Sequence, residues 1–411
     1  MSTPAAHKPL TGIRLIDLTH MLSGPYAGML LADLGCDTVK VEPPGRGEGT
    51  RRLLEDDPSY SLHGMGAYFF TLNRNKRSVA IDLKSEAGLE FFYELVRHAD
   101  VVLDNFSAGV TGRLKIDHET LAVHNPAIVT CTVTGFGEDG PDYKRPAFDQ
   151  IVQGLGGGMS ITGSSADEPV RAGIPIGDLG GGMFAVMGIQ AALLARQRTG
   201  VGQHVDISML DVQISLLNYM ATMYGMSGNI PEPIGNSHFV HTPYNSFATQ
   251  DDMIVIAVIG DTFWPAMVDV VNVDALRDPR FDTAPERLKE KAFIEGLIAE
   301  QLKTRPAAEW LEALQAARIP CARGNNFAQA LSDAQVLHRN MFVELQHPVG
   351  GTARVPGNPI KLSVDSADTF APPPLLGADT TEVFQEWTEL PAHRVSEGIE
   401  SGVLQQGEYP N

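Results

Sequence analysis

The segment between Arg171 and Asp206 carries the side chain with the most specific chemistry in this sequence. Asp178 follows a short apolar stretch and lies two residues before a cluster of three glycines at 180–182. An apolar run at 183–194 then predicts a buried helix. A carboxylate at a helix N-terminus meets unpaired backbone N–H groups and the positive end of the dipole, which favour its ionised form. The pattern therefore indicates Asp178 as a candidate nucleophile.

The glycines around Asp178 support two interpretations. Each glycine costs a helix roughly 1 kcal/mol relative to alanine, so a cluster of them needs a reason. In one interpretation Gly177, Gly180 and Gly181 leave room for a ligand and present N–H groups to an oxyanion. In the other, the aspartate is an ordinary helix cap and the glycines form a helix-packing face. This segment alone leaves both open.

Composition excludes several classes of partner. The formal net charge of −19 argues against nucleic acids and anionic membrane surfaces. No apolar run reaches the roughly 20 residues of a membrane span, and the first ten residues lack the apolar core of a signal peptide. Cys36, Cys131 and Cys321 are too dispersed for a disulfide framework or a zinc site. We expect a cytoplasmic protein without a metal.

The first half of the chain alternates strands with helices, which predicts an α/β fold with parallel strand pairing. Strands are expected at 13–18, 38–42, 79–83, 101–103, 127–134 and 203–207, and helices at 26–34, 85–97 and 183–194. The first strand–helix turn lacks the G-x-G-x-x-G fingerprint, so we expect no dinucleotide cofactor.

The second half differs in character. We expect a linker from residue 218, a hairpin at 244–249 and 253–259, and helices at 262–271, 287–303 and 307–317. Strands return after residue 341, a helix follows at 380–389, and the polar tail from 397 is expected to fray. The resulting domains are 1–217, 218–330 and 331–411. The outer two form one large Rossmann-like domain, and the middle one is a small α+β domain.

Basic and polar side chains recur in or near the loops of the large domain. Loops that follow strand ends are the usual ligand-binding positions of α/β sheets. A local cationic set in an acidic chain suits phosphates, although a scatter of solvated surface charges is the alternative. The set comprises His20, Lys40, Arg74, Lys76, Arg77, Asn105 and Arg113.

Six segments together resemble the class III CoA-transferases, the group that includes formyl-CoA transferase and the carnitine CoA-transferase. The resemblance covers nearly the whole chain, and the number and order of the motifs make it specific. The segments are GIRLIDLTHMLSGPYAGMLLADLGCDTVKVE, LNRNKRSVAIDL, DNFSAGVTGRL, GIPIGDLGGG, TGVGQHVDISMLD and PLLGADTTEV.

The resemblance implies a covalent mechanism. The nucleophile of this family is an aspartate in the Gly-Asp segment, which Asp178 matches. It attacks an acyl-CoA thioester to form a mixed anhydride and then an aspartyl-CoA thioester. Coenzyme A and acyl-CoA are substrates, and no tightly bound cofactor is implied. The family also forms interlocked homodimers, so a homodimer is expected here.

The resemblance also implies a CoA site. His20 matches the family's loop after the first strand, and Asn105, Phe106 and Arg113 match the segment that lines the CoA site. A further family motif contains Lys76 and Arg77, which we expect near the nucleotide end.

Departures from related enzymes narrow the activity. Leu22 replaces the glutamine of formyl-CoA transferase, and the later loop at 235–241, with Gly235 and His241, lacks that enzyme's run of four glycines. This disfavours formate–oxalate exchange and suits a larger acceptor. The related α-methylacyl-CoA racemases use the histidine of a G-H-D triplet. The matching triplet here contains Phe148, which cannot transfer a proton, so we favour a transferase.

The substrates are predicted only by class. Succinyl-CoA or a similar dicarboxylyl-CoA is the expected donor, and a short-chain or aryl-substituted dicarboxylate, or a sulfinate analogue, is the expected acceptor. Arg74, Arg171 and His241 are candidates for the second carboxylate of the acceptor. The alternatives are a racemase, a non-catalytic CoA-binding subunit and an acyl-CoA sensor.

Overall fold

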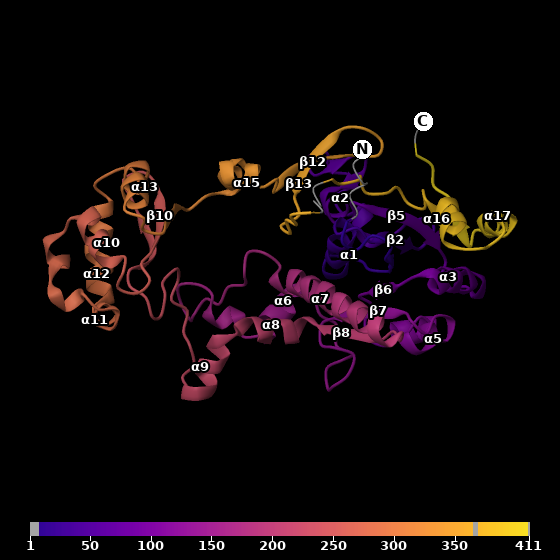
Figure 1. Cartoon of the computed structure of the whole chain (residues 1–411), viewed down its shortest axis with the longest axis horizontal. Helices are drawn as coiled ribbons and strands as arrows, with labels where there is room; N and C mark the ends of the chain where they lie inside the picture. The colour runs from indigo at the N-terminus through magenta and orange to yellow at the C-terminus, as the bar shows by residue number, and fades with distance from the viewer. Residues whose placement is uncertain (1–7, 365–368, 410–411) are drawn as a thin grey trace. The chain divides into compact units, whose positions relative to one another are not determined.

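The computed structural model describes residues 8–364 and 369–409 and divides the chain into two compact units (Figure 1). The first unit contains the chain up to Gly158, the segment Ala172–Thr222 and the chain from Ala334 onward. The second contains Met159–Arg171 and Met223–Asp333. No pattern in the sequence indicated that Met159–Arg171 belongs to the second unit. Residues 1–7, which belong to the N-terminal stretch considered above, lie outside the described residues.

A seven-stranded sheet forms the centre of the first unit. Its strand order is β14-β5-β2-β1-β6-β7-β8, and every neighbouring pair is parallel except β14 with β5. This confirms the α/β fold with a mostly parallel sheet. The strands are β1 (Arg14–Asp17), β2 (Asp37–Glu42), β5 (Lys76–Ile81), β6 (Val101–Asp104), β7 (Val129–Thr134), β8 (His204–Ser208) and β14 (Leu404–Gln405).

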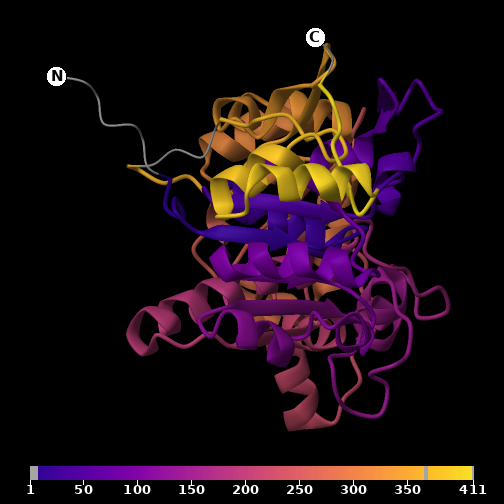
Figure 2. The same ribbon diagram turned by 90° about the vertical axis from the view of Figure 1, so that its right-hand side faces the viewer.

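Alternate residues of the central strands face opposite sides of the sheet, and each side has its own apolar core. Leu15 packs with α1 (Ser23–Asp33) and α7 (Ile176–Thr199), whereas Ile16 packs with helices on the other side. Those helices are α3 (Glu86–His98), α16 (Thr380–Trp387) and α17 (Ala392–Glu400). Figure 2 shows the two C-terminal helices, in yellow, beside the indigo N-terminal strands. Both ends of the chain therefore build the same sheet layer.

Shorter elements complete the first unit. They include two antiparallel hairpins, β3 with β4 and β12 with β13. Their bounds are η1 (Gly49–Arg52), β3 (Ser61–Leu62), β4 (Met65–Gly66), α2 (Ala67–Leu72), α4 (Val110–Leu114), α5 (His118–His124), α6 (Asp149–Leu155), α8 (Met209–Leu217), α15 (Ala334–His338), β12 (Phe342–Gln346) and β13 (Thr352–Pro356).

The second unit has a three-stranded antiparallel sheet, ordered β11-β10-β9, packed against helices around Trp310 and Phe281. Its elements are β9 (Tyr244–Ala248), β10 (Met253–Ala257), α10 (Trp264–Val271), α11 (Ala284–Lys289), α12 (Lys291–Leu302), α13 (Ala307–Ala316), β11 (Cys321–Arg323) and α14 (Phe327–Ser332). The expected hairpin is present. The expected helix at 287–303 is divided at Glu290, and the three-residue strand β11 was too short to be predicted.

Two segments expected to be irregular are ordered. The expected linker begins instead with α9 (Tyr219–Ser227), which contains good helix formers and a single glycine. The tail expected to fray from 397 contains the end of α17 and the strand β14. Burial explains this order. Leu404 is only 1% exposed where it packs against the sheet, and the free energy of burying it outweighs the tendency of the polar residues around it to stay in solvent.

One helix of the described chain, α7, is long and apolar enough to span a membrane by length and composition. It lies along β7 and against α1, and Ile189 within it is fully buried. We therefore describe it as a core helix of the first unit.

Candidate active site

The loops that leave β1 and β6 meet at the point where the strand order of the sheet reverses. β1 pairs with β2 on one side and with β6 on the other. In open α/β sheets, ligands bind in the crevice at the carboxyl ends of such a strand pair. The backbone N–H of His20 donates to Asn105 Oδ1 at 2.9 Å, and Asn105 Nδ2 donates to the His20 carbonyl at 2.7 Å. The rings of His20 and Phe106 are 5.5 Å apart. Three predicted CoA-site residues are thus brought together.

A buried ion pair supports the loop after β1. Lys76 Nζ donates to Asp17 Oδ2 at 2.7 Å, and neither side chain is exposed. Lys40 Nζ donates to the Thr19 carbonyl at 2.7 Å. Burial would raise the pKa of Asp17, but Lys76 and Lys40 together hold that pKa below its usual value. Because the Lys76 side chain is fully buried, it cannot contact the nucleotide part of CoA. Lys76 positions the loop instead.

Two other arginines of the predicted basic set are also occupied by structural contacts. Arg74 is 1% exposed and binds both carboxylate oxygens of Asp33, at 2.7 and 3.0 Å. The structure therefore does not support Arg74 as a ligand for the acceptor carboxylate. Arg77 binds Asp37 at 2.7 Å and Glu386 at 2.6 Å, which ties β5 to α16. Both arginines therefore have structural roles, because each is paired with a carboxylate that is remote in sequence.

Arg113 is an exposed cation near the switch point. It lies on α4, which follows the Asn105–Phe106 loop, and its guanidinium has no ion-pair partner among the described residues. We expect Arg113→Ala to raise the apparent KM for acyl-CoA about tenfold, because one charge-assisted contact to a phosphate is lost, with a smaller effect on kcat. Steady-state kinetics check this result. Arg97→Ala, which removes an exposed arginine paired with Glu94, is the control. An unchanged KM in the Arg113 variant would exclude it from the site.

The helix that carries Asp178 begins earlier than expected. Helix α7 starts at Ile176, and its N-cap residue Pro175 provides no side-chain cap. The glycines therefore lie inside the helix rather than before it. A Cβ at Gly180 would lie 2.8 Å from Val212, and a Cβ at Gly182 would lie 2.7 Å from the Ser23 carbonyl oxygen. The helix-packing interpretation therefore accounts for them.

The oxyanion role predicted for these glycines is not supported. Gly180 and Gly181 lie within the helix, where backbone N–H groups bond to the preceding turn. The N–H of Gly177 donates to Asp149 Oδ1 at 2.8 Å.

The packing of these glycines also shows which helix lies beside Asp178. An added Cβ at Gly181 would lie 2.8 Å from Ser23 Oγ, so the first turns of α7 cross the start of α1. Asp178 lies one turn away on that face.

Asp149, the first residue of α6, organises the start of α7. Its Oδ1 accepts from the Gly177 N–H and, at 3.4 Å, from the Asp178 N–H. Its Oδ2 accepts from Gln153 at 2.7 Å. Asp149 thus supplies the cap that Pro175 cannot supply.

The Asp178 carboxylate is partly buried and accepts no hydrogen bond from the described residues. Burial raises its pKa to about 6, and the negative charge of Asp149 adds to the shift. These two effects outweigh the helix dipole on which the sequence interpretation relied. The pKa of Tyr68, on α2, is raised by burial and then by the charges of Asp178 and Asp149. The phenol is therefore close enough to both carboxylates to be affected by their charges.

We expect Asp149→Asn to lower the pKa of Asp178, because a neighbouring negative charge is removed while an acceptor oxygen for the Gly177 N–H remains. The acid limb of kcat/KM should move to lower pH by about half a pH unit. A pH–rate profile measures the shift. Gln153→Met removes one hydrogen bond to Asp149 but no charge, and it should leave the limb in place. If the acid limb does not move in the Asp149 variant, the charge of Asp149 does not contribute to the raised pKa of Asp178.

The remaining predicted residues lie in the second unit. Gly235 has a φ of 62°, and its N–H donates to the Gly163 carbonyl at 2.8 Å. The ring of His241 stacks on His238 at 4.7 Å. Arg171 also belongs to this unit. The roles of these residues toward the acceptor stay predictions.

Sequence reasoning missed Asp149 and Tyr68. Asp149 stands in the triplet compared with the racemases, but only its Phe148 neighbour was considered. An aspartate as the first residue of a helix was the available signal. Tyr68 lies in the apolar run AYFFTL, which has no feature that separates a site residue from a core residue. No group of His, Cys, Asp or Glu suited to a metal ion occurs among the described residues.

Comparison with known proteins identifies the family and the fold of the chain. The sequence model of CoA-transferase family III matches residues 10–380. The chain belongs to CoA-transferase family III. It is therefore a class III CoA-transferase, as the motifs predicted. Its fold is that of the family: a crystal structure of a CAIB/BAIF family protein from Brucella suis is 32% identical, with a TM-score of 0.81, and the match covers 93% of this chain and 100% of that chain.

Two curated family members show the range of reactions among relatives. The acetyl-CoA:oxalate CoA-transferase of Acetobacter aceti is 38% identical, over 88% of this chain and 91% of that protein. The succinyl-CoA:glutarate CoA-transferase of Mus musculus is 32% identical, over 98% of this chain and 91% of that protein. Each name pairs an acyl-CoA donor with a dicarboxylic acid.

Proposed function

We propose that this CoA-transferase moves CoA from succinyl-CoA, or a similar dicarboxylyl-CoA, to a dicarboxylate acceptor through covalent intermediates on Asp178. The observation that carries the proposal is the Asp178 carboxylate itself. It is partly buried, accepts no hydrogen bond from the described residues, and stands at the helix start that crosses α1. The dicarboxylic substrates named for the relatives from Acetobacter aceti and Mus musculus support the substrate class.

In the proposed reaction, one Asp178 oxygen attacks the thioester carbonyl of the donor, the C–S bond breaks, and CoA leaves as a thiolate. The product is a mixed anhydride. The thiolate then attacks the aspartyl carbonyl, which releases the donor carboxylate and leaves an aspartyl-CoA thioester. The acceptor carboxylate attacks that thioester and expels the thiolate again. The thiolate finally attacks the acceptor acyl carbon, which forms the new acyl-CoA and restores Asp178.

The electrostatics around Asp178 suit this role. With a pKa of about 6, roughly nine in ten Asp178 side chains are ionised at pH 7. The carboxylate is also more basic than an exposed aspartate, which favours attack. Burial excludes part of the water that would hydrolyse an anhydride. Asp149 supports the reaction by holding the backbone of Asp178 in place.

The CoA moiety is proposed to bind at the switch point between β1 and β6. His20 and Phe106 offer ring contacts, and Arg113 offers an unpaired cation for a phosphate. Asn105 holds the two loops together through its paired hydrogen bonds with His20. The buried pair of Lys76 and Asp17 supports the loop that carries His20, because Asp17 also accepts from the Thr19 backbone N–H.

A homodimer is part of the proposal. In the first unit, large apolar side chains are exposed just before α6 and on α7 and α8, among them Phe148 at 68%, Met187 at 52% and Ile214 at 49%. Contiguous exposed apolar surface favours a protein interface. Light scattering after size-exclusion chromatography should give twice the 44.3 kDa chain mass, and a monomer at micromolar concentration would contradict this. The cytoplasmic location stays a prediction.

Intact-protein mass spectrometry tests the chemistry. Wild type and Asp178→Asn are mixed with succinyl-CoA in the absence of an acceptor. We expect a CoA-sized adduct on the wild type alone, because only a carboxylate forms the aspartyl-CoA thioester. An adduct on both proteins would place the nucleophile elsewhere. The absence of an adduct on either would contradict the donor assignment, and exchange at the α-carbon of a 2-methylacyl-CoA would then test a racemase.

A further inference from the structure

The last residue of β6, Asp104, carries a buried carboxyl group directly before the Asn105–Phe106 loop. Its Oδ1 accepts from the Phe106 backbone N–H at 3.1 Å. Its Oδ2 accepts from the Thr132 hydroxyl, on the neighbouring strand β7, at 2.9 Å. One carboxyl group therefore connects the sheet to the loop that presents the Phe106 ring.

Asp104 differs from other buried carboxylates of the same sheet in having no paired cation. Asp17 lies 2.7 Å from Lys76, and neither side chain is exposed. Glu42 lies 2.6 Å from Arg51. Within the described part of the chain, Asp104 has its two hydrogen bonds but no ion pair. Burying an ionised carboxylate without a cation is costly, so the protonated form of Asp104 competes with the ionised one.

A cavity of about 400 Å³ lies beside Asp104, on the side of the sheet that Val102 also faces. Of the described residues that line it, none is a proposed CoA contact. Helix α4 contributes only the uncharged Thr111. The titratable groups of the lining, from β6, β8, the start of α5 and the loop after β7, are Asp104, Asp117, His118, Glu119, Glu138 and His204.

These surroundings place the ionisation of Asp104 near neutral pH. Burial raises the pKa of Asp104 to about 7, and the hydrogen bonds from Thr132 and from the Phe106 N–H oppose that rise. The negative charge of Glu138 raises the pKa further, whereas the charge of His204 lowers it. Because His204 Nε2 lies 2.5 Å from Glu138 Oε2, the effects of these two groups on Asp104 largely offset each other. Burial is therefore the dominant cause.

We propose that Asp104 is a positioning residue of the CoA site, whose ionised carboxylate holds Phe106 in place and whose protonation weakens that hold. A hydrogen bond to an ionised acceptor is roughly twice as strong as one to a neutral acceptor. The Phe106 ring lies 5.5 Å from the ring of His20, so a looser Phe106 backbone alters the surface offered to CoA. The inference rests on the proposed CoA site at the switch point. It implies that CoA binds more tightly above neutral pH than below it.

Isothermal titration of the full-length protein with free CoA, at about pH 5.5 and about pH 8.5, tests the inference. Asp104→Asn keeps an acceptor oxygen for the Phe106 N–H but cannot ionise. The two proteins should bind CoA alike at the lower pH, where both side chains are neutral. At the higher pH, wild type should bind about fivefold more tightly, and the difference should develop around pH 7. Ionisation of the CoA phosphates, of His20 and of Asp178 occurs in both proteins and cancels in the ratio of dissociation constants.

Thr132→Val provides a second variant of nearly the same shape. It removes the hydroxyl that donates to Asp104 Oδ2 and so destabilises the ionised form of Asp104. With Thr132→Val combined with Asp104→Asn as its reference, the midpoint of the difference should move to higher pH by about half a unit. A midpoint that does not move would show that Asp104 is not the titrating group.

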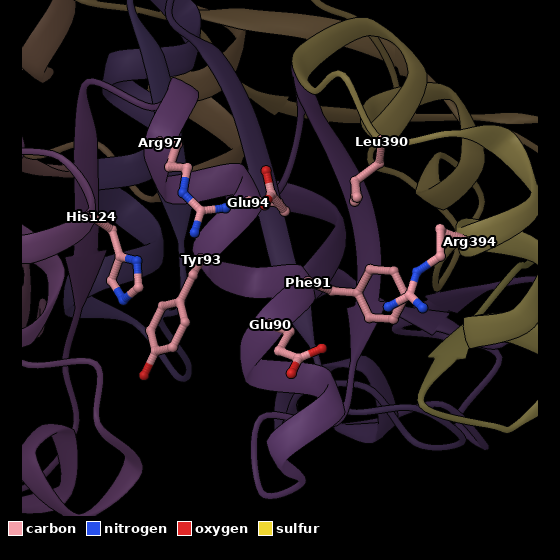
Figure 3. A pocket seen from close by; sticks show the side chains of 8 residues that line it. All are labelled: Glu90, Phe91, Tyr93, Glu94, Arg97, His124, Leu390 and Arg394. Carbon is pink, nitrogen blue, oxygen red and sulfur yellow. Dashed lines mark hydrogen bonds and ion pairs between the residues drawn. The ribbon is translucent and has the colours of Figure 1, made fainter.

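A histidine in a second cavity provides the control. Figure 3 shows this cavity over α3, with His124 beside Tyr93. The two rings stack at 4.0 Å, and His124 lies at the opposite end of α5 from His118. His124→Gln removes a titratable ring remote from Asp104, so CoA affinity should depend on pH as in wild type.

The possible failures can be told apart. Asp104→Asn that binds CoA as tightly as wild type at the higher pH would overturn the inference. A loss of equal size at both pH values would overturn it too, because a purely structural role does not depend on ionisation. Loss of the pH dependence in His124→Gln would place the titrating group elsewhere. Wild type that binds no CoA at either pH would contradict the proposed CoA site itself, and the inference would fail with it.

Discussion

Asp178→Asn is expected to lose transferase activity by roughly three or more orders of magnitude while it keeps the fold. An amide cannot attack the thioester to form an anhydride, so no covalent intermediate accumulates. Turnover of succinyl-CoA with a dicarboxylate measures the loss. Asp149→Asn is the matched control, because it removes a neighbouring carboxylate and keeps the proposed nucleophile. An Asp178 variant with turnover within tenfold of wild type would contradict the assignment.

The same variant should change stability in a defined pH window. The folded-state pKa of Asp178, about 6, lies above the value of 3.8 for an unperturbed aspartate. Between these values the folded chain binds more protons than the unfolded chain, so the free energy of unfolding falls as the pH rises to about 6. Replacing the carboxyl group by an amide abolishes this loss of unfolding free energy. Asp178→Asn should therefore exceed wild type by about 1–2 kcal/mol at pH 7.5, after allowance for partial exposure, and match it near pH 3.5. Urea unfolding at both pH values tests this.

Lys76→Met is expected to cause the largest loss of stability, about 3–5 kcal/mol. The substitution leaves the fully buried carboxylate of Asp17 without the cation that lies 2.7 Å away. It also loosens the loop that carries His20, because Asp17 accepts from the Thr19 N–H at 2.9 Å. The apparent KM for acyl-CoA should rise as well. Denaturant unfolding and steady-state kinetics measure the two effects.

A double-mutant cycle separates this ion pair from simple loss of packing. Asp17→Asn combined with Lys76→Met should be less destabilised than the sum of the single variants, since no unpaired charge remains buried. Arg97→Met breaks the exposed pair with Glu94 and should cost less than 1 kcal/mol. Equal losses for Lys76→Met and Arg97→Met would show that burial does not set the strength of the pair.

Local sequence patterns were sufficient for the layout of the large unit. Alternation of strands and helices predicted a parallel sheet. Gly200, which follows α7 in the left-handed region at a φ of 73°, ends that helix as a glycine at this position usually does. Such features depend on residues close together in the chain, so the sequence pattern alone predicts them. The order imposed on the C-terminal tail could not be read in this way, because it comes from burial of Leu404 against β5.

The sequence by itself determined the candidate nucleophile, the family and the class of reaction, since motif order and residue type carry them. Tertiary structure decided which basic side chains are free to contact a ligand. Lys76 and its partner Asp17 are 59 residues apart, and only the pairing of strands brings them together in the core. Tertiary structure also decided the state of Asp178. Its raised pKa comes from burial and from Asp149 on another helix, and long-range packing sets both.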